Sequence, residues 1–428
     1  MLAAVVALVV ALVTGYFLAP DLLWHHAQIG ALAGDPLQPR VALTFDDGPG
    51  TDTAAVLDRL KEAGVHATFF LVAEEAARRP DLARRIAAEG HDIGLHGYRH
   101  RSSYLLGPWA TWQEVRRGTR ALTAITGIRP RYYRPPWGHH NLITVAAARA
   151  QGLTRVMWSV APDDWRRDRT AEGIAARVVR LALPGSIVVL HDGGGDRRQT
   201  VAALPRLIAG LRAIGIEPGP VSALTPEPSY LQRAWAWWEI RFTQRWQVDT
   251  VPTGGHGLSA IRIGRARYHG PRLELPAASG PVHLAPGAWF GEIHLGNAAL
   301  ARFSDDPRKA GVRALGLMLN GLKNLARYLD QNPEYTGITA VGGLTVLNAG
   351  RAVEQLGFTV RPAREWWVLP MWLYLLLLLA IYHRQGWRAF HRAGHLKPIW
   401  ALMSVEELQR RYGARKGGRR TPAADPEA

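Results

Sequence analysis

Two adjacent carboxylates, Asp46 and Asp47, lie at the end of a short apolar run and are followed by a Gly48–Pro49 turn. The run Val41–Phe45 alternates and is rich in strand-forming residues, which predicts a β-strand ending at the carboxylates. Two neighbouring aspartates repel each other unless a cation or a proton lies between them. One is therefore a candidate metal ligand and the other a candidate base. The alternative is a solvated Asp-Gly turn with local backbone hydrogen bonds.

His96 and His100 are separated by three residues and follow the predicted strand Asp92–Leu95. This spacing lets two imidazoles reach one ion, although two surface histidines are the ordinary alternative. Together with one carboxylate of the Asp pair they would form a three-ligand site with an open position, which is typical of a catalytic metal. Zinc is the default for nitrogen and oxygen ligands, and cobalt, manganese or iron would also fit.

Three further polar clusters follow predicted strands. Arg134, which could orient a carboxylate in bidentate fashion, precedes a rigid Pro-Pro-Trp-Gly segment. Asp164 stands beside Trp165, whose indole could wall a small apolar pocket. His191 ends the apolar run Ile187–Leu190, and an imidazole with a pKa near neutrality suits a general acid. Taken singly, each cluster is compatible with an ordinary surface loop.

Short apolar runs alternate with amphipathic helical patterns from Arg40 to about Leu224. The predicted strands are Arg40–Phe45, Ala67–Val72, Asp92–Leu95, Arg131–Arg134, Thr154–Val160, Ser186–Leu190 and Ile214–Val221. The predicted helices are Thr53–Glu62, Pro80–Glu89, Thr111–Thr126, Leu142–Gln151, Thr170–Ala182 and Thr200–Ala213. This alternation indicates an α/β domain with a parallel sheet, and the number of units favours a barrel. Because active sites are built at the carboxyl ends of barrel strands, we expect the five polar clusters to meet there.

In this order, the clusters resemble the polysaccharide deacetylase (NodB homology) domain, carbohydrate esterase family 4. The segments that carry the resemblance are Thr44–Pro49, His96–His100, Arg134–Gly138, Asp164–Trp165 and Leu190–Asp192. The resemblance assigns residues 36–224 to this domain. It implies a distorted, incomplete (β/α) barrel and a metal-dependent hydrolase that removes acetyl groups from N-acetylated sugars.

The resemblance also implies a role for each matching residue. The catalytic residues would be Asp46 as general base, Arg134 as its orienting partner, His191 as general acid and Asp164 as the group that polarises it. The metal ligands would be Asp47, His96 and His100. The substrate-binding residues would be Trp137, whose backbone N–H helps to hold the oxyanion, with Trp165 and Leu190 around the acetyl group.

Two positions depart from the family pattern. Gly97 stands where the family usually has Ser or Thr, whose hydroxyl supports the loop that carries the ligands. Ala161 stands near the place of a usual Asp or Asn. The ligands are retained, but these departures predict a different support for the histidine loop and a different positioning of the substrate.

Composition limits the chemistry and the partners. The chain has 428 residues, enough for two or three domains, and no cysteine, which excludes disulfides and thiolate metal sites. Its formal net charge of +17 indicates anionic partners such as membrane headgroups or acidic cell-wall polymers. Nucleic acid is not expected as a partner, because no zinc-finger or RNA-recognition signature accompanies the charge.

Two apolar stretches flank the chain. Residues 1–24 contain an uncharged apolar run with Trp24 at its edge, which predicts an N-terminal transmembrane anchor; a cleaved signal peptide is the alternative. Residues 366–383 predict a second transmembrane helix, with a buried or interfacial helix as the alternative. The basic tail 384–428 would then be cytoplasmic and near anionic lipid, with the catalytic domain outside the cell membrane.

Residues 225–365 differ in character and are expected to form a smaller, accessory α+β domain of unknown role. The aromatic-rich segment Trp237–Trp246 is expected to be a strand, and about Arg308–Leu329 a long helix.

The sequence as a whole predicts a membrane-tethered, metal-dependent N-deacetylase. Its substrate would be an amino-sugar polymer of the cell envelope, either peptidoglycan or a chitin-like glycan. The alternatives are a deacylase or deformylase of a lipid-linked sugar, and a catalytically silent carbohydrate-binding module.

Overall fold

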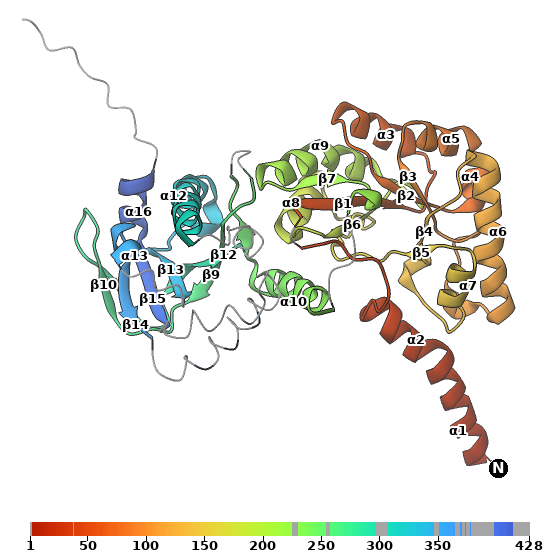
Figure 1. Cartoon of the computed structure of the whole chain (residues 1–428), viewed down its shortest axis with the longest axis horizontal. Coiled ribbons are helices and arrows are strands. Elements are labelled where there is room, and N and C mark those ends of the chain that lie inside the picture. Colours follow the sequence, from red (N-terminus) through yellow and green to blue (C-terminus); the bar gives the residue numbers. More distant parts are fainter. Residues whose placement is uncertain are drawn as a thin grey trace, which may run out of the picture. The chain divides into compact units, whose positions relative to one another are not determined.

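The computed structural model describes residues 2–36, 38–224, 230–253, 257–296, 307–345, 351–363 and 398–413, together with residues 369, 373 and 377 (Figure 1). The chain divides into two compact units, of which the first is Met1–Gln247 with Gly255–Leu258 and the second is Val248–Gly254 with Ser259–Ala428.

The first unit is built on a seven-stranded parallel sheet. Its strands are β1 (Arg40–Asp46), β2 (Thr68–Leu71), β3 (Asp92–Leu95), β4 (Tyr132–Tyr133), β5 (Thr154–Arg155), β6 (Ile187–His191) and β7 (Glu217–Gly219). They run in the order β5-β4-β3-β2-β1-β6, and β7 pairs with the start of β1. Beyond β5 the chain reaches β6, where Val160 forms a parallel bridge with Val188. The sheet therefore curls back on itself, in agreement with the predicted distorted and incomplete barrel.

Helices connect successive strands, as parallel pairing requires. They are α3 (Thr53–Glu62), α4 (Ala73–Arg78), α5 (Pro80–Ala88), α6 (Pro108–Thr126), α7 (Thr144–Ala150), α8 (Ala171–Leu181) and α9 (Arg198–Ala213). Their apolar faces are buried; in α9, for example, Leu204, Leu207 and Leu211 recur at helical spacing and are fully buried. The sheet contributes its own core, where Ala42, Phe70 and other apolar side chains pack together.

The aromatic-rich segment predicted as a strand is helical instead, and that prediction is wrong. It belongs to α10 (Tyr230–Trp246), which is part of the first unit. The rings of Trp238, Phe242 and Trp246 recur four residues apart and contact one another in succession along the helix. The indole N–H of Trp235 donates to Glu239 one turn later, at 3.0 Å. This i, i+4 pattern decides the conformation, whatever the strand propensity of tryptophan.

The second unit has α+β character. Its six-stranded sheet has the order β14-β15-β13-β12-β9-β8. The strands are β8 (Asp249–Thr250), β9 (Ile261–Arg267), β12 (Trp289–Leu295), β13 (Ala340–Thr345), β14 (Thr359–Pro362) and β15 (Ile399–Ser404), beside a small hairpin of β10 (Leu273–Leu275) and β11 (Val282–Leu284). The helices are α12 (Pro307–Gln331), α13 (Arg351–Gln355) and α16 (Val405–Tyr412). The sheet is antiparallel except where β12 pairs with β13, and Leu322 and Leu325 of α12 share its core.

The expected flanking transmembrane helices are not found, and this part of the predicted fold is wrong. No helix in the described part of the chain is both long enough and apolar enough to cross a bilayer. The first α-helix, α1 (Leu2–Val13), has 12 residues and is followed by a π-helical turn, Thr14–Leu18. From Tyr16 onward this segment contacts other parts of the first unit: the Tyr16 hydroxyl donates to the Leu106 carbonyl, and the Leu142 N–H donates to the Tyr16 carbonyl.

The second predicted span, 366–383, lies outside the described residues except for residues 369, 373 and 377. The strands on either side of this segment belong to one sheet. Strand β15 pairs with both β13 and β14, so residues after the predicted span share one sheet with residues before it. The predicted cytoplasmic tail 384–428 therefore contains β15 and α16 of the second unit.

Candidate active site

The ends of two neighbouring strands bring the predicted base and acid together. In the parallel register of β1 and β6, Asp46 lies directly beside His191. Both strands end at these residues, so their side chains lie at the carboxyl edge of the sheet. Asp46 is buried, with 3% of its surface exposed. A buried carboxylate needs a cationic or hydrogen-bonding partner, which a third strand supplies.

That partner is Arg134, which follows β4 and is fully buried. Its guanidinium donates to Asp46 Oδ1 at 2.6 Å and to Thr44 Oγ1 at 2.8 Å. The remaining contacts go to the carbonyls of Val156 and Met157, at 3.1 and 3.2 Å. Burial lowers the pKa of Arg134, and the charge of Asp46 opposes that shift. Arg134 therefore holds one oxygen of Asp46 in a fixed place and leaves the other, Oδ2, for chemistry.

Asp47, His96 and His100 converge as predicted. Asp47 Oδ1 lies 3.3 Å from His96 Nε2 and 3.1 Å from His100 Nε2. The other ring nitrogen of His96 lies 2.8 Å from the carbonyl of Arg134. That carbonyl only accepts, so Nδ1 of His96 carries a proton, and Nε2 is the ring atom that would bind a metal. The three groups form one of two clusters among the described residues whose donor atoms could hold a metal ion.

The conformation of the Asp47 loop keeps this carboxylate next to the histidines. Asp47 has φ of 70°, a left-handed conformation that aspartate tolerates better than most residues. Although burial favours its neutral form, contacts with His100 and His96 hold the pKa of Asp47 well below its ordinary value. Asp47 is therefore anionic at any physiological pH.

His191 is oriented by Asp164, as predicted. Its Nδ1 lies 2.8 Å from Asp164 Oδ1, and its backbone N–H donates to Asp164 Oδ2 at 2.9 Å. Thr200 donates to the same Oδ2 at 2.8 Å, which fixes the carboxylate. Burial opposes protonation, but the bond to Asp164 and the charges of Asp46 and Asp47 raise the pKa of His191 to about 9. Without a bound cation, His191 is therefore protonated near neutrality and can donate from Nε2.

The three predicted substrate-binding residues differ in exposure. Trp137 and Trp165 are half exposed, at 51% and 58%, whereas Leu190 is fully buried beside Phe45. The ring of Trp137 contacts that of His100, with centroids 4.1 Å apart, so it borders the metal-ligand cluster. Trp137 has φ of 56°, and this left-handed residue turns the loop after Arg134. The contacts of these three residues with a substrate stay a prediction.

Gly97, the departure in the histidine motif, has a conformational reason. Its φ is +91°, and a Cβ at this position would lie 2.8 Å from the carbonyl of Arg99. A serine or threonine would therefore be strained in this loop. The support comes from the backbone instead, because the Gly97 carbonyl accepts from Ala73 and the Tyr98 carbonyl accepts from Glu74.

Sequence reasoning missed the role of Asp192, although it belongs to the quoted Leu190–Asp192 segment. Asp192 is fully buried, and Thr53 Oγ1 donates to its Oδ2 at 2.5 Å. Burial, together with the charges of Asp47 and Asp46, raises the pKa of Asp192 to about 7. A Cβ on Gly48 would lie 2.2 Å from the same carboxyl group. Asp192 thus holds the loop after β1 against the end of β6.

Several known proteins are similar to this chain. The polysaccharide deacetylase family profile matches residues 33–156. A peptidoglycan-N-acetylglucosamine deacetylase of Bacillus cereus is 34% identical over 194 residues, which are 45% of this chain and 70% of that protein. The chain belongs to the polysaccharide deacetylase family. The predicted membership of this family, whose enzymes are hydrolases of carbon–nitrogen bonds, is confirmed.

Other relatives extend the comparison. A chitooligosaccharide deacetylase of Bradyrhizobium sp. is 38% identical over 197 residues, which cover 43% of this chain and 90% of that protein. A crystal structure of a peptidoglycan N-acetylglucosamine deacetylase is 33% identical and covers 45% of this chain and 91% of that one, with a TM-score of 0.44. These three relatives each match less than half of this chain. Residues 228–412 match a different profile, the YkoP domain.

Proposed function

We propose that this deacetylase-family chain is a metal-dependent hydrolase that removes N-acetyl groups from an amino-sugar polymer of the cell envelope. The observation that carries the proposal is one juxtaposition at the carboxyl edge of the sheet. A carboxylate fixed by Arg134 lies beside a three-ligand cluster and next to an imidazole fixed by Asp164. The relatives named above act on peptidoglycan or chitooligosaccharides, which gives the substrate class.

The residues fit a divalent metal. Ligand atoms about 2.0–2.1 Å from a tetrahedral zinc ion lie about 3.3–3.4 Å apart. The two separations measured from Asp47 Oδ1, 3.3 and 3.1 Å, are close to this value. One carboxylate and two imidazoles also suit zinc, cobalt, manganese or iron, with zinc as the first expectation. When bound, the ion would polarise the amide carbonyl and make a nearby water more acidic.

The chain's own groups would carry the protons. Asp46, held by Arg134, would take a proton from the attacking water. The water oxygen bonds to the acetyl carbon, the carbon–nitrogen bond breaks, and acetate and a free amine result. His191 would donate its Nε2 proton to the departing nitrogen, while Asp164 holds the ring in the tautomer that permits it. The Trp137 backbone N–H would help to stabilise the oxyanion.

Acetate release tests the proposal and separates its substrates. The full chain is stripped with a chelator, reloaded with zinc, and assayed on chitooligosaccharide, peptidoglycan fragments and a lipid-linked amino sugar. We expect release from a polymer fragment by the reloaded protein and not by the stripped one. Release from the lipid-linked sugar alone would favour the alternative substrate. No release of any acyl group from the three would favour a binding module instead. The extracytoplasmic location of this activity stays a prediction.

A further inference from the structure

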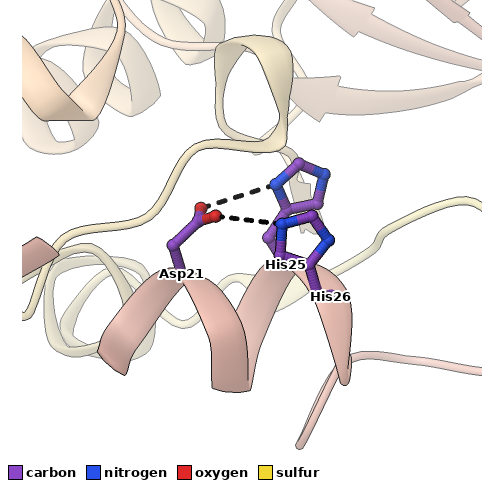
Figure 2. Close-up of side chains that lie close together, drawn as sticks. All are labelled: Asp21, His25 and His26. Carbon is purple, nitrogen blue, oxygen red and sulfur yellow. Dashed lines mark ion pairs between the residues drawn. The ribbon is translucent and has the colours of Figure 1, made fainter. Parts of the chain in front are cut away.

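The second metal-compatible cluster lies outside the catalytic edge, on the N-terminal helix. Its members are Asp21, at the end of α2 (Ala19–Asp21), and His25 and His26, at the end of a π-helical turn. Figure 2 shows the carboxylate of Asp21 facing both imidazoles. A π turn is wider than an α turn, so the residues at positions i+4 and i+5 both lie on the same helix face as residue i. Here residue i is Asp21, and the other two are His25 and His26. The local backbone therefore presents all three side chains together.

Distances within the cluster fit an ion better than direct pairing. His25 Nδ1 lies 3.4 Å from Asp21 Oδ1, and His26 Nε2 lies 3.4 Å from Asp21 Oδ2. Both separations exceed the usual hydrogen-bond range of about 2.7–3.2 Å. The two distances start from different carboxylate oxygens, and one ligand atom from each of the three residues lies within 4.8 Å of the others, which is close enough for the three to share one ion. His25 Nδ1 is buried and has no hydrogen-bond partner among the described residues, so this nitrogen is available to bind a metal ion.

Surrounding contacts fix the cluster in place. Asp21 is buried, and its Oδ1 accepts the backbone N–H of His140 at 3.2 Å. Two residues after the cluster, the Gln28 side chain donates to the Trp158 carbonyl at 2.8 Å. Such outer contacts orient ligands before a metal binds. His26 forms the solvent-exposed edge of the cluster. Its side chain is 61% exposed, so an ion could reach the cluster from solvent on this side.

The cluster also adjoins the active-site loop. A Cβ added at Gly138 would lie 2.8 Å from His25 Nε2, so the imidazole packs directly on the backbone next to Trp137. The rings of His25 and His139 are 6.2 Å apart. An ion bound through the opposite ring nitrogen, Nδ1, would hold His25 against this loop. The N-terminal helix would then be fastened to the segment that carries a predicted substrate-binding residue.

We propose that Asp21, His25 and His26 form a second binding site for a zinc-class divalent ion, which fastens the N-terminal helix to the loop around Trp137. Two imidazoles and one carboxylate leave a fourth position for water or an external ligand. The site shares no residue with the catalytic cluster, so the proposal stands independently of the proposed deacetylase activity.

Zinc stoichiometry of the stripped and reloaded full chain tests the proposal. We expect two zinc ions per chain for the wild type and one each for Asp47→Ala and His26→Ala. The double variant should bind none. The matched control is His283→Ala, because His283 is exposed, lies 3.5 Å from Glu274 and belongs to no three-ligand cluster in the described part of the chain. This control should keep two. Two ions in His26→Ala, no ion in Asp47→Ala, or a loss in the control would overturn the proposal.

A second measurement separates binding from misfolding. In the Asp47→Ala background only the proposed site remains, so zinc should raise the unfolding temperature, since a ligand that binds the native state stabilises it. Adding His26→Ala should abolish this rise while the metal-free unfolding temperature stays the same. A rise that persists in the double variant, or none in Asp47→Ala alone, would contradict the second site.

Discussion

At the scale of single residues, the candidate active site depends on buried charges that are held by hydrogen-bonding partners. Arg134 is the clearest case, because its guanidinium joins Asp46, Thr44 and two backbone carbonyls in the interior. Removing one partner of a buried ion pair leaves the other charge without compensation. The same arrangement that orients the predicted base therefore also stabilises the fold.

Arg134→Met should lower the free energy of unfolding by about 3–5 kcal/mol, because Asp46 would remain as a buried and unpaired charge. Urea unfolding of the full chain measures this loss. Arg84→Met is the matched control, since Arg84 pairs with Asp81 at 2.9 Å on the surface. An exposed pair of this kind is worth about 0–1 kcal/mol. Equal effects of the two substitutions would contradict the structural role of Arg134.

His191 gives a prediction about pH. Its pKa of about 9 in the metal-free protein lies above the ordinary value of 6.5. Protonated His191 therefore stabilises the folded state fully below about pH 6.5, and this stabilisation is lost as the pH rises through about 9. Asp164→Asn removes the charge that favours the imidazolium and should lower the pKa by about 1–3.

Nuclear magnetic resonance titration of the imidazole checks this prediction in the stripped protein. Zinc bound at Asp47 should also lower the pKa of His191, because the negative charge of Asp47 raises that pKa and the zinc ion would neutralise this charge. Thr123→Val serves as a control, since the Thr123 hydroxyl bonds within α6 and should leave the titration unchanged. A pKa that is the same in wild type and Asp164→Asn would show that Asp164 does not set the protonation of His191.

At the scale of elements, the site is made by strand ends that approach one another closely. The loop after β1 passes against the end of β6, where Gly48 and Gly193 have no room for a side chain. The strands themselves could be predicted from the sequence, because apolar alternation and polar clusters marked both their positions and their carboxyl ends. The role of Asp192 could not, since a buried carboxyl beside Thr53 depends on a contact between segments 139 residues apart.

Gly48→Ala tests this close approach. The new methyl group would lie 2.2 Å from the Asp192 carboxyl group, so the loop must shift and carry Asp47 away from the histidines. Overpacking of this kind costs about 1–3 kcal/mol and should weaken zinc binding at the catalytic cluster. Gly107→Ala is the control, because a Cβ there has no neighbour within 4 Å. Zinc affinity of Gly48→Ala equal to that of Gly107→Ala would refute the packing argument.

At the scale of the whole molecule, apolar composition alone proved a poor guide. The sequence favoured a membrane anchor at 1–24, yet the helical segment there ends in contacts with the first unit. Hydropathy does not distinguish an apolar segment that lies in lipid from one that packs on protein. It also does not reveal which strands pair when they are far apart in the chain. The pairing of β15 with β13 could not be predicted from the local pattern, because the partners are far apart in the chain.

Leu402→Ala tests the place of β15 in the second unit. Leu402 is fully buried and lies opposite Gly342 of β13 and Thr359 of β14. Truncation of a buried leucine costs about 2–5 kcal/mol. Hydrogen exchange should therefore become faster in peptides that contain β13 and β14. Leu315→Ala, at a position with 45% exposure on α12, should change exchange little. Unchanged protection of both strands in Leu402→Ala would contradict the pairing of β15 with β13 and β14.

The most direct test of the account is acetate release by Asp46→Asn, measured on the zinc-loaded full chain together with its metal content. Asparagine keeps the size of the side chain and a partner for Arg134 but cannot accept a proton from water. Asp46→Asn should retain zinc at the Asp47, His96 and His100 cluster and lose activity by about 10²–10⁴-fold. Activity close to wild type in the zinc-loaded variant would contradict this prediction.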